Sequence, residues 1–326
     1  MRSGGRFGGG SETRCSLVVF APSPILTITV EAGAQDGGDI HLHAGGQGFW
    51  VARMAASLGA EVSLCCALGG ETGRVLRALI AAEEVVVQAV QSEAANGAYI
   101  HDRRSGERVE VALNPAEHLG RHDLDELYGI TLASGLDADV TLLTGVQPEQ
   151  VLDADVYRRL AGDLRANGRM VIADLTGGPL AAALAGGLTV LKISHDELLA
   201  EGRAASAEMH DLIEGMRKLK LAGAESVLLS RGPVPAFALD GEREAARTLK
   251  LSGPRFEAAD PTGSGDSMFA ALGVGLGSGG SLVDALKLAM AAGALNATRR
   301  GLGTGTRDEI QRLSRHVDLN PLAVAD

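Results

Sequence analysis

The sequence has few cysteines, fewer basic than acidic residues and no long apolar run. Its 3 cysteines, Cys15, Cys65 and Cys66, form neither a C-x-x-C metal motif nor a disulfide framework, so we expect a protein of a reducing cytoplasm. The 41 acidic residues outnumber the 30 basic ones, and a net charge of −11 argues against broad nucleic-acid binding. No apolar run is long enough to span a bilayer. These absences predict a cytoplasmic protein with neither a nucleic-acid nor a membrane partner.

The beginning of the chain differs in composition from the rest. Residues 1–14 are rich in glycine and basic residues and lack the apolar segment of a signal peptide, so we expect a disordered tail. Hydrophobic residues make up 45% and charged residues 22% of the chain, which is a globular composition. Residues 15–326 are therefore expected to form one domain, a size that a single α/β core can reach.

Beyond the tail, short apolar runs alternate with segments of helical periodicity. Strands are predicted over 15–21, 61–68, 139–145, 170–177, 188–194 and 226–232, and helices over 49–59, 156–168 and 208–223. This alternation is typical of a mostly parallel sheet with helices on both faces. Two stretches, about 25–43 and 98–113, alternate apolar with polar residues instead. They predict a small antiparallel extension with one solvated face.

Residues 258–272, AADPTGSGDSMFAAL, combine a glycine turn, an acid and the start of an apolar helix. The amides of Gly263, Ser264 and Gly265 would be free donors at the helix N-terminus, where the helix dipole favours an anion. A carboxylate at that place, Asp266, suits a general base that takes a proton from a hydroxyl during phosphoryl transfer. From these residues alone, a simple helix-capping role for Asp266 is equally well supported.

The motif resembles the D-T-x-G-A-G-D signature of the PfkB (ribokinase-like) carbohydrate kinases. A second signature, with a G-G-K-G-x-N-V-A core, is similar to residues 44–73. Further matches follow in order as LLTG, ADLTG, KISHDEL and LLSRG at 142–145, 173–177, 192–198 and 228–232. The resemblance covers nearly the whole chain from about Cys15. The branch of 1-phosphofructokinase and tagatose-6-phosphate kinase fits best.

The resemblance implies a ribokinase-like three-layer sandwich with a mostly parallel central sheet and a β-sheet lid. It also implies transfer of the γ-phosphoryl group of ATP, with Mg²⁺, to a hydroxyl of a small sugar-type substrate. Asp266 would be the general base, and Gly263, Ser264 and Gly265 would form the anion hole. Lids of this family often pair across dimers, so a homodimer through the lid is expected.

The resemblance assigns the remaining site residues to three groups. The nucleotide would contact Lys192, Ser230, Gly232 and Asn296. The acceptor would contact Gly45, Gly46, Gln47, Trp50 and Asn114. Glu197 would help to hold the metal. Taken singly, each has a structural alternative, such as a solvated charge for Lys192 or a helix-end position for Glu197 and Asn296.

The acceptor side departs from the family pattern at four positions. Gln47 replaces the lysine of the glycine-rich turn, and Trp50, the only tryptophan, replaces its asparagine. Ile25 stands where a sugar-binding aspartate is usual, and Ala95 where sugar-phosphate kinases carry an arginine. We favour an ATP-dependent carbohydrate kinase. Two alternatives remain open: a catalytically weak binding protein, and a nucleoside kinase in which Trp50 stacks on a base.

The departures also bear on the charge of the acceptor. Gln47 and Ala95 are uncharged, whereas a buried phosphate dianion needs cationic partners. Three arginines of the second alternating stretch, Arg103, Arg104 and Arg108, could supply charge only if they turned inward. We therefore expect an unphosphorylated acceptor.

Overall fold

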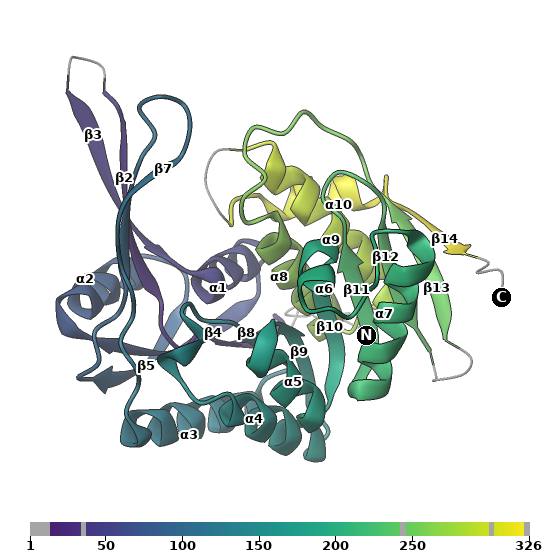
Figure 1. Cartoon of the computed structure of the whole chain (residues 1–326), viewed down its shortest axis with the longest axis horizontal. Coiled ribbons are helices and arrows are strands. Elements are labelled where there is room, and N and C mark those ends of the chain that lie inside the picture. Colours follow the sequence, from purple (N-terminus) through teal and green to yellow (C-terminus); the bar gives the residue numbers. More distant parts are fainter. Residues whose placement is uncertain (1–13, 34–36, 242–245, 300–302, 323–326) are drawn as a thin grey trace, which may run out of the picture.

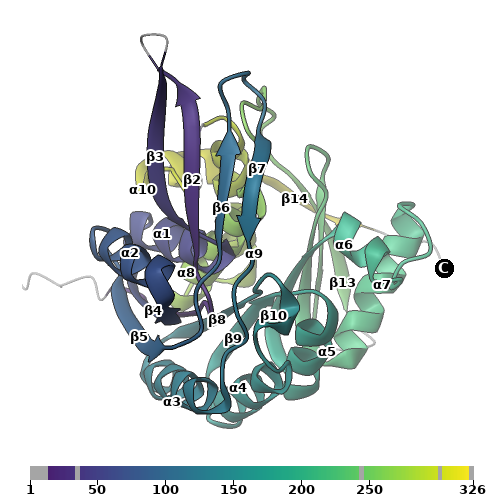
Figure 2. The same ribbon diagram turned by 60° about the vertical axis from the view of Figure 1, so that its left-hand side comes forward.

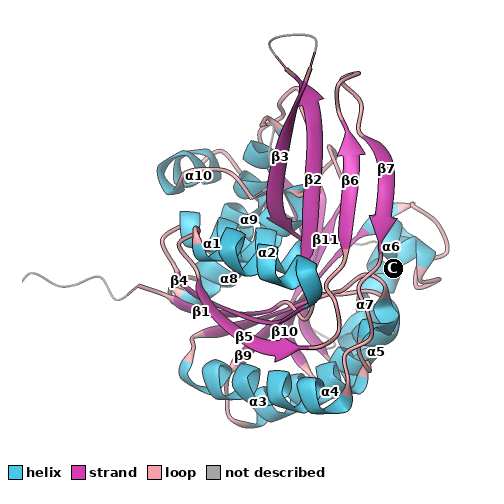
Figure 3. Ribbon diagram, turned by 90° about the vertical axis from the view of Figure 1, so that its left-hand side faces the viewer, coloured by secondary structure: helices cyan, strands magenta, loops and turns pink. Residues whose placement is uncertain are grey.

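The structure is a computed structural model that describes residues 14–33, 37–241, 246–299 and 303–322. The predicted tail lies outside these ranges except for its last residue. Two separate sheets organise the described chain, one of 10 strands and one of 4. Figure 3 shows helices on both faces of the large sheet and the small sheet projecting from it. The expected α/β sandwich with a small second sheet is confirmed.

The large sheet forms the body of the molecule. Its strands are β1 (Ser16–Phe20), β4 (Glu61–Gly69), β5 (Val86–Ser92), β8 (Val140–Thr144), β9 (Met170–Asp174), β10 (Leu188–Ser194), β11 (Ala224–Ser230), β12 (Ala236–Asp240), β13 (Arg247–Ser252) and β14 (Asp318–Leu322). They lie in the order β14-β13-β12-β11-β10-β9-β8-β1-β4-β5. Every pairing from β11 to β5 is parallel, whereas β12, β13 and β14 add an antiparallel edge. The carboxyl ends of the parallel strands therefore share one edge.

Helices cover both faces of this sheet. One face packs against α1 (Gln47–Ser57), α2 (Gly70–Ala81), α8 (Ser264–Gly277), α9 (Leu282–Ala297) and α10 (Arg307–Ser314). The other packs against α3 (Arg121–Asp137), α4 (Asp155–Ala166), α5 (Gly177–Gly186), α6 (His195–Ala200) and α7 (Met209–Ala222). A short 3₁₀ turn, η1 (Glu149–Val151), precedes α4. Within the described ranges, no helix has both the length and the apolar character to cross a membrane.

The central strands are apolar on both faces because both faces are covered. In β1, Leu17 and Val19 point into the layer of α1, α8 and α9, and Val18 and Phe20 point into the layer of α3 and α4. All four side chains are at most 2% exposed. This is the near-continuous apolar run that a doubly covered parallel strand requires.

The small sheet, called the lid below, contains β3 (Gly38–Gly45), β2 (Ile25–Ala32), β6 (Ala98–Asp102) and β7 (Val109–Asn114) in that order. It stands beyond one end of the body in both views of the chain (Figures 1 and 2). The pairs β2–β3 and β6–β7 are antiparallel, as expected from the sequence. The pair β2–β6 between them is parallel, because each strand leaves the body in the same direction.

The two faces of the lid differ in character. One face carries Ile28, Val30, Ile40, Leu42 and Ile100, which occupy opposite positions on neighbouring strands. Ile40 is 65% and Leu42 46% exposed, so the outer part of this apolar face has no covering layer in the described chain, whereas Ile28 packs against the core of the body. The opposite face carries Thr27, Thr29, His41, His43, Tyr99 and His101. The lid therefore has one polar and one apolar face.

Besides the apolar packing at its base, polar contacts at two places attach the lid to the body. Asn96, two residues before β6, is 2% exposed; its side chain accepts from Gly69 N at 2.9 Å and donates to Pro24 O and Ala67 O at 3.1 and 3.0 Å. At the far end, Arg103 donates to Asp260 Oδ2 at 3.2 Å. Among the described residues, this is the one ion pair that joins the lid to the body.

Candidate active site

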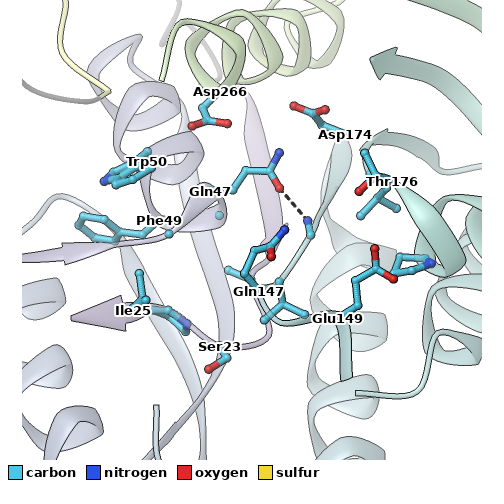
Figure 4. Close-up of a pocket in the computed structure, with 18 of the residues that line it drawn as sticks. Ser23, Ile25, Gln47, Phe49, Trp50, Gln147, Glu149, Asp174, Thr176 and Asp266 are labelled. Carbon is cyan, nitrogen blue, oxygen red and sulfur yellow. Dashed lines mark hydrogen bonds between the residues drawn. The ribbon is translucent and has the colours of Figure 1, made fainter. Parts of the chain in front are cut away.

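The sequence-predicted residues converge where the parallel strands end. In register, Thr144 at the end of β8 lies beside Asp174 of β9, and Asp174 lies beside Lys192 of β10. The N-termini of α1 and α8 approach the same edge and bring Gln47 and Asp266 to it (Figure 4). A cavity of about 370 Å³ opens there between the body and the lid. In open α/β sheets, ligands bind outside this edge.

A buried ion pair lies at the centre of this edge. Lys192 Nζ lies 2.7 Å from Asp174 Oδ2, and the two side chains are 5% and 3% exposed. Burial raises the pKa of Asp174 to about 6, against the attraction of Lys192. For Lys192 burial acts in the opposite direction, but the attraction of Asp174 and Glu197 outweighs it and raises the pKa. The lysine therefore stays charged inside the protein.

Asp266 lies in the first turn of α8, half-buried, and faces the cavity. Burial raises its pKa to about 7, and the nearby charges of Asp174 and Glu197 add to the rise. Lys192 and the side-chain amide of Gln47 act the other way. A carboxyl group that titrates near neutral pH is well matched to accepting a proton at that pH.

The glycine turn before Asp266 has the backbone that the sequence predicts. Gly263 is the N-cap of α8 in the left-handed region, at φ 75°, a conformation that glycine adopts without strain. A Cβ on Gly265 would lie 2.9 Å from Lys192 Nζ. The ammonium group of Lys192 therefore lies directly against the turn. Its charge and the free first-turn amides favour an anion at the same place.

Asn296 supports this turn from behind. Its side chain is fully buried in α9; Nδ2 donates to Thr262 O at 2.8 Å and to Ser264 Oγ at 3.4 Å. Asp260 fixes the start of the turn, since its Oδ1 accepts from Thr262 N at 3.0 Å. Asn296 does not line the cavity.

Gln47 connects the second glycine-rich turn to the carboxylates. It is the first residue of α1, after Gly46 at φ 93°. Its Oε1 accepts from Gly145 N at 2.7 Å, which directs the amide nitrogen toward Asp174 and Asp266 (Figure 4). The amide nitrogen of Gln47 thus faces the space between the two acids.

The other predicted residues differ in position. Glu197 lines the cavity, and its Oε2 accepts from Ser194 N and Oγ, both at 2.7 Å, in a capping box at the start of α6. Ser230 and Gly232 lie at the end of β11, outside the cavity lining. Asn114 is exposed at the end of β7 and does not line the cavity either.

Several cavity residues were not among the candidates from the sequence. Asp174 is one of them. It ends a buried strand, shortly before Thr176 caps the next helix, and this position at the carboxyl edge of the sheet could have identified it from the sequence. The others with polar side chains are Ser23, Tyr99 of the lid, Gln147, Glu149 and Thr176. Among the described residues that line the cavity, none is lysine or arginine.

The three hairpin arginines are engaged elsewhere. Arg103 pairs with Asp260, as described above. Arg104 pairs with Asp102 at 2.6 Å within the lid. Arg108 donates to Tyr99 Oη at 2.5 Å and lies over the ring of that tyrosine. In this conformation none of them lines the cavity.

Comparison with solved structures defines the class of fold. The chain is similar to phosphofructokinase-2 from Escherichia coli in complex with potassium (TM-score 0.78, 24% identity, 93% of this chain and 98% of that chain). It is also similar to ribokinase from Arabidopsis thaliana complexed with ribose and ATP (TM-score 0.71, 19% identity, 93% and 99%). The fold is ribokinase-like.

Sequence comparison identifies the family. The profile described as pfkB family carbohydrate kinase matches residues 22–309, and the chain belongs to this family of carbohydrate kinases. Relatives named ATP-dependent 6-phosphofructokinase isozyme 2 come from Escherichia coli (27% identity, 82% of this chain and 86% of the relative) and Mycobacterium tuberculosis (30%, 82% and 78%). The resemblance noted from the sequence is thereby confirmed.

Substitution of Gly265 tests the anion-binding turn. We expect Gly265→Val to lower kcat/KM for ATP at least ~10-fold, about 1.4 kcal/mol, because its side chain would push against Lys192 and crowd the amides. Steady-state kinetics and thermal unfolding measure the two effects separately. The control is Gly129→Val on α3, where an added Cβ meets nothing within 4 Å. Wild-type kinetics, or unfolding of the Gly265 variant alone, would contradict the assignment.

The raised pKa of Asp266 predicts the pH dependence of activity. Only the ionised carboxylate accepts a proton, so kcat/KM should fall ~10-fold per pH unit below a pKa of about 7. Gln47→Leu removes an amide that lowers this pKa, so the inflection should move to higher pH. The measurement is kcat/KM between pH 5.5 and 9. A flat profile, or a downward shift in the variant, would show that Asp266 does not govern the reaction.

Proposed function

We propose that the protein transfers the γ-phosphoryl group of ATP to a hydroxyl of an unphosphorylated sugar-type acceptor. One observation carries the proposal: Asp266, with a pKa near neutrality, stands beside a glycine turn that is backed by the buried charge of Lys192. Membership of the carbohydrate kinase family supports the same chemistry. Strongly perturbed pKa values cluster at catalytic sites, and an acid that titrates near neutrality is suited to proton transfer.

In the proposed reaction, Asp266 takes the proton of the acceptor hydroxyl as its oxygen attacks the γ-phosphorus. The bond between that phosphorus and the bridging oxygen of ADP breaks, and ADP leaves with the electron pair. Negative charge on the transferring group is stabilised by the amides at Gly263, Ser264 and Gly265 and by Lys192 behind them. Asn296 holds the turn in place through Thr262 and Ser264.

The nucleotide is proposed to extend from the glycine turn toward the end of β11. Ser230 ends that strand, and Gly232 follows at φ 58° with no atoms within 4 Å of the position of a Cβ. This open backbone allows close approach of a ligand. Lys192 and Asn296 influence the nucleotide through the turn that they support. Ser230 and Gly232 contact it from the end of β11.

The residues present fit a magnesium ion that is held largely by its substrate. Among the described residues, no group of three or more His, Cys, Asp and Glu side chains is arranged to hold a metal. Glu197 lines the cavity with one carboxylate oxygen that the capping box does not use. Mg²⁺ commonly binds through one or two carboxylates together with phosphates and water. Glu197 would hold the ion, which would neutralise charge on the phosphates.

The acceptor is proposed to lie on the turn at Gly45 and Gly46, with its reacting hydroxyl between Gln47 and Asp266. Trp50 forms one wall of this space. Asn114 would contact the acceptor only if the end of β7 moved toward the cavity. The cavity lining carries carboxylates and, in the described chain, no lysine or arginine, which disfavours a phosphate group on the acceptor.

We propose that the apolar lid face (Ile28, Val30, Ile40, Leu42 and Ile100) packs against the same face of a second copy. A contiguous apolar surface on a lone sheet is costly in water, and a two-fold contact would cover both copies at once. A solved structure of the related phosphofructokinase-2 from Escherichia coli is described as a tetrameric inhibited form. Self-association of this chain is consistent with that finding.

Replacement of the proposed base tests the reaction. Asp266→Asn should retain nucleotide binding and lose turnover by on the order of 10²–10⁴, the usual contribution of a positioned base. ADP release over a panel of sugars, sugar phosphates and nucleosides gives turnover, and calorimetry gives ATP affinity. Wild-type turnover in the variant would exclude Asp266 as the base. A wild-type protein that binds members of the panel and phosphorylates none would be a binding protein.

The charge of the acceptor can be tested with matched pairs. We expect fructose to have a kcat/KM at least equal to that of fructose 6-phosphate, because no cation lines the cavity in the described chain. A preference of ~10-fold or more for the phosphorylated sugar, about 1.4 kcal/mol, would refute this expectation. If Arg103→Ala or Arg104→Ala then abolished the preference, that arginine would be the missing cation.

The lid contact predicts a change in oligomeric state. Leu42→Glu places a charge in the apolar lid face, so the dimer should dissociate at concentrations at which the wild type is associated. Light scattering after gel filtration measures the mass of each. The matched control is His43→Glu, on the opposite face of the same strand. Equal masses for wild type and Leu42→Glu would place the interface elsewhere.

A further inference from the structure

Another cavity, called the rear cavity below, lies at the far ends of α1 and α8 and has a volume of about 370 Å³. Leu58 at the end of α1 and Val274 in α8 line it, whereas Gln47 and Asp266 lie at the starts of the same helices. At about 1.5 Å per residue, these positions are roughly 12–17 Å apart along each helix. The linings of the two cavities share no described residue. The rear cavity is therefore separate from the candidate active site.

Two arginines contribute to the lining of the rear cavity. Arg14 precedes β1, and Arg307 is the first residue of α10. The described lining contains no aspartate or glutamate, although the whole chain has 41 acidic and 30 basic residues. Within the described ranges, neither arginine forms an ion pair or a side-chain hydrogen bond. Two guanidinium groups at one cavity repel each other, and an anion between them would relieve the repulsion.

The acidic residues near the rear cavity do not neutralise these arginines. Asp139, whose charge acts on Cys15 of the lining, accepts from Ser16 N and Oγ at 2.8 and 2.9 Å. Arg14 also borders a neighbouring cavity, whose lining includes three acids, Glu61, Glu84 and Asp137. In the described part of the chain, Arg14 pairs with none of them.

Capping does not explain the position of Arg307. The N-terminus of a helix is the positive end of its dipole and disfavours a cation. The guanidinium lies instead over Gly59, where a Cβ would be 3.3 Å from Nη1. The last carbonyls of α1 are already used there, since Gly59 N donates to Ala56 O at 2.8 Å and Ala60 N to Ala55 O at 3.2 Å. Arg307 therefore reaches the cavity with its donors unused by the described chain.

The rest of the lining is largely apolar. Leu58, Ala60 and Val274 are at most 8% exposed. Half-buried Leu288 of α9 adds a further aliphatic side chain. Burial raises the pKa of the Cys15 thiol to about 11, so this group is uncharged at neutral pH. The volume falls within the range of about 300–1,000 Å³ that is usual for small-molecule sites.

We propose that the rear cavity binds a small phosphate monoester whose organic part is apolar. A phosphate monoester carries nearly two negative charges at neutral pH, which match the two guanidinium groups of Arg14 and Arg307. Each guanidinium can donate two parallel hydrogen bonds to phosphate oxygens. The apolar part covers Leu58, Val274 and Leu288 and removes their surface from water. Hydroxyls of a sugar phosphate would stay unpaired against this lining, which is costly.

Calorimetry with phenyl phosphate as the probe tests the site while a non-hydrolysable ATP analogue fills the nucleotide site. We expect phenyl phosphate to bind at least ~10-fold more tightly than inorganic phosphate, which lacks the apolar part, and than benzoate, which has one charge. This readout does not depend on turnover, so it stands or fails separately from the proposed reaction. No binding of phenyl phosphate, or equal affinities for the three probes, would overturn the proposal.

Arginine variants test the charged part of the rear cavity. Arg14→Leu and Arg307→Leu should each weaken phenyl phosphate binding at least ~10-fold, because each loses a charge-assisted contact. The matched control is Arg121→Leu on α3, whose side chain is 96% exposed and outside the cavity. Wild-type affinity in both cavity variants would refute the assignment.

The apolar part is tested at an independent position. Leu288→Glu should abolish binding, because its charge repels the phosphate and disrupts the apolar wall, whereas Leu288→Met should retain binding. Circular dichroism shows whether each variant is folded. If Leu288→Glu is folded and binds as the wild type does, the ligand lies elsewhere.

Chemical labelling locates the ligand without removing any of its proposed contacts. Gln311 lines the rear cavity and is exposed, so Gln311→Cys supplies a reactive thiol, whereas the native cysteines are at most 7% exposed. Phenyl phosphate should slow the reaction of this cysteine with a neutral maleimide. Gln91→Cys on β5, exposed and outside the cavity, should react at an unchanged rate. Protection of both cysteines, or of neither, would overturn the proposal.

Discussion

The ion pair between Lys192 and Asp174 is the constraint on which the site depends. Three carboxylates, Asp174, Glu197 and Asp266, surround one buried ammonium group at the ends of β9 and β10. Removing charges from water is costly, and a buried pair persists only when each partner stays satisfied. The excess of negative charge keeps the lysine charged, and burial together with the neighbouring carboxylates leaves Asp266 only weakly acidic. The same lysine lies against the glycine turn, so the proposed base and the proposed anion site are electrostatically coupled.

Much of the fold could be predicted because the central strands are short, continuous apolar runs, as parallel strands covered on both faces must be. The run 188–194 and strand β10 coincide, and the helix expected over 208–223 is α7 within one residue at each end. The observed end of an element differs from the predicted one where a glycine starts the next helix. The strand expected to reach residue 177 ends at Asp174, because Gly177 at φ 60° opens α5. The edge strands β12, β13 and β14 were not predicted. They form by pairing outward from β11, and the local periodicity of a sequence does not show such pairing.

The site was predictable where a motif is local and less so where it depends on tertiary contacts. The motif around Asp266 and the turn at Gln47 are each continuous in sequence, and the structure brings both to one cavity. Asp174 and Tyr99 were missed because their roles come from partners on other strands. Ser230, Gly232 and Asn114 lie away from the cavity. Their assignment rests on the family resemblance.

The contact of Arg103 with Asp260 has a consequence for how two ligands influence each other. Asp260 uses one oxygen for the arginine of the lid and the other for the amide of Thr262, the residue before Gly263. When the binding sites of two ligands share a structural element, the binding free energies of the two ligands are coupled, and the coupling is reciprocal. A molecule that draws the lid inward alters the affinity of the turn for phosphate, and phosphate alters the affinity for that molecule by the same factor. Sugar and nucleotide would then show synergism, and salt would weaken it only slightly, because the Arg103 and Asp260 side chains are just 22% and 14% exposed.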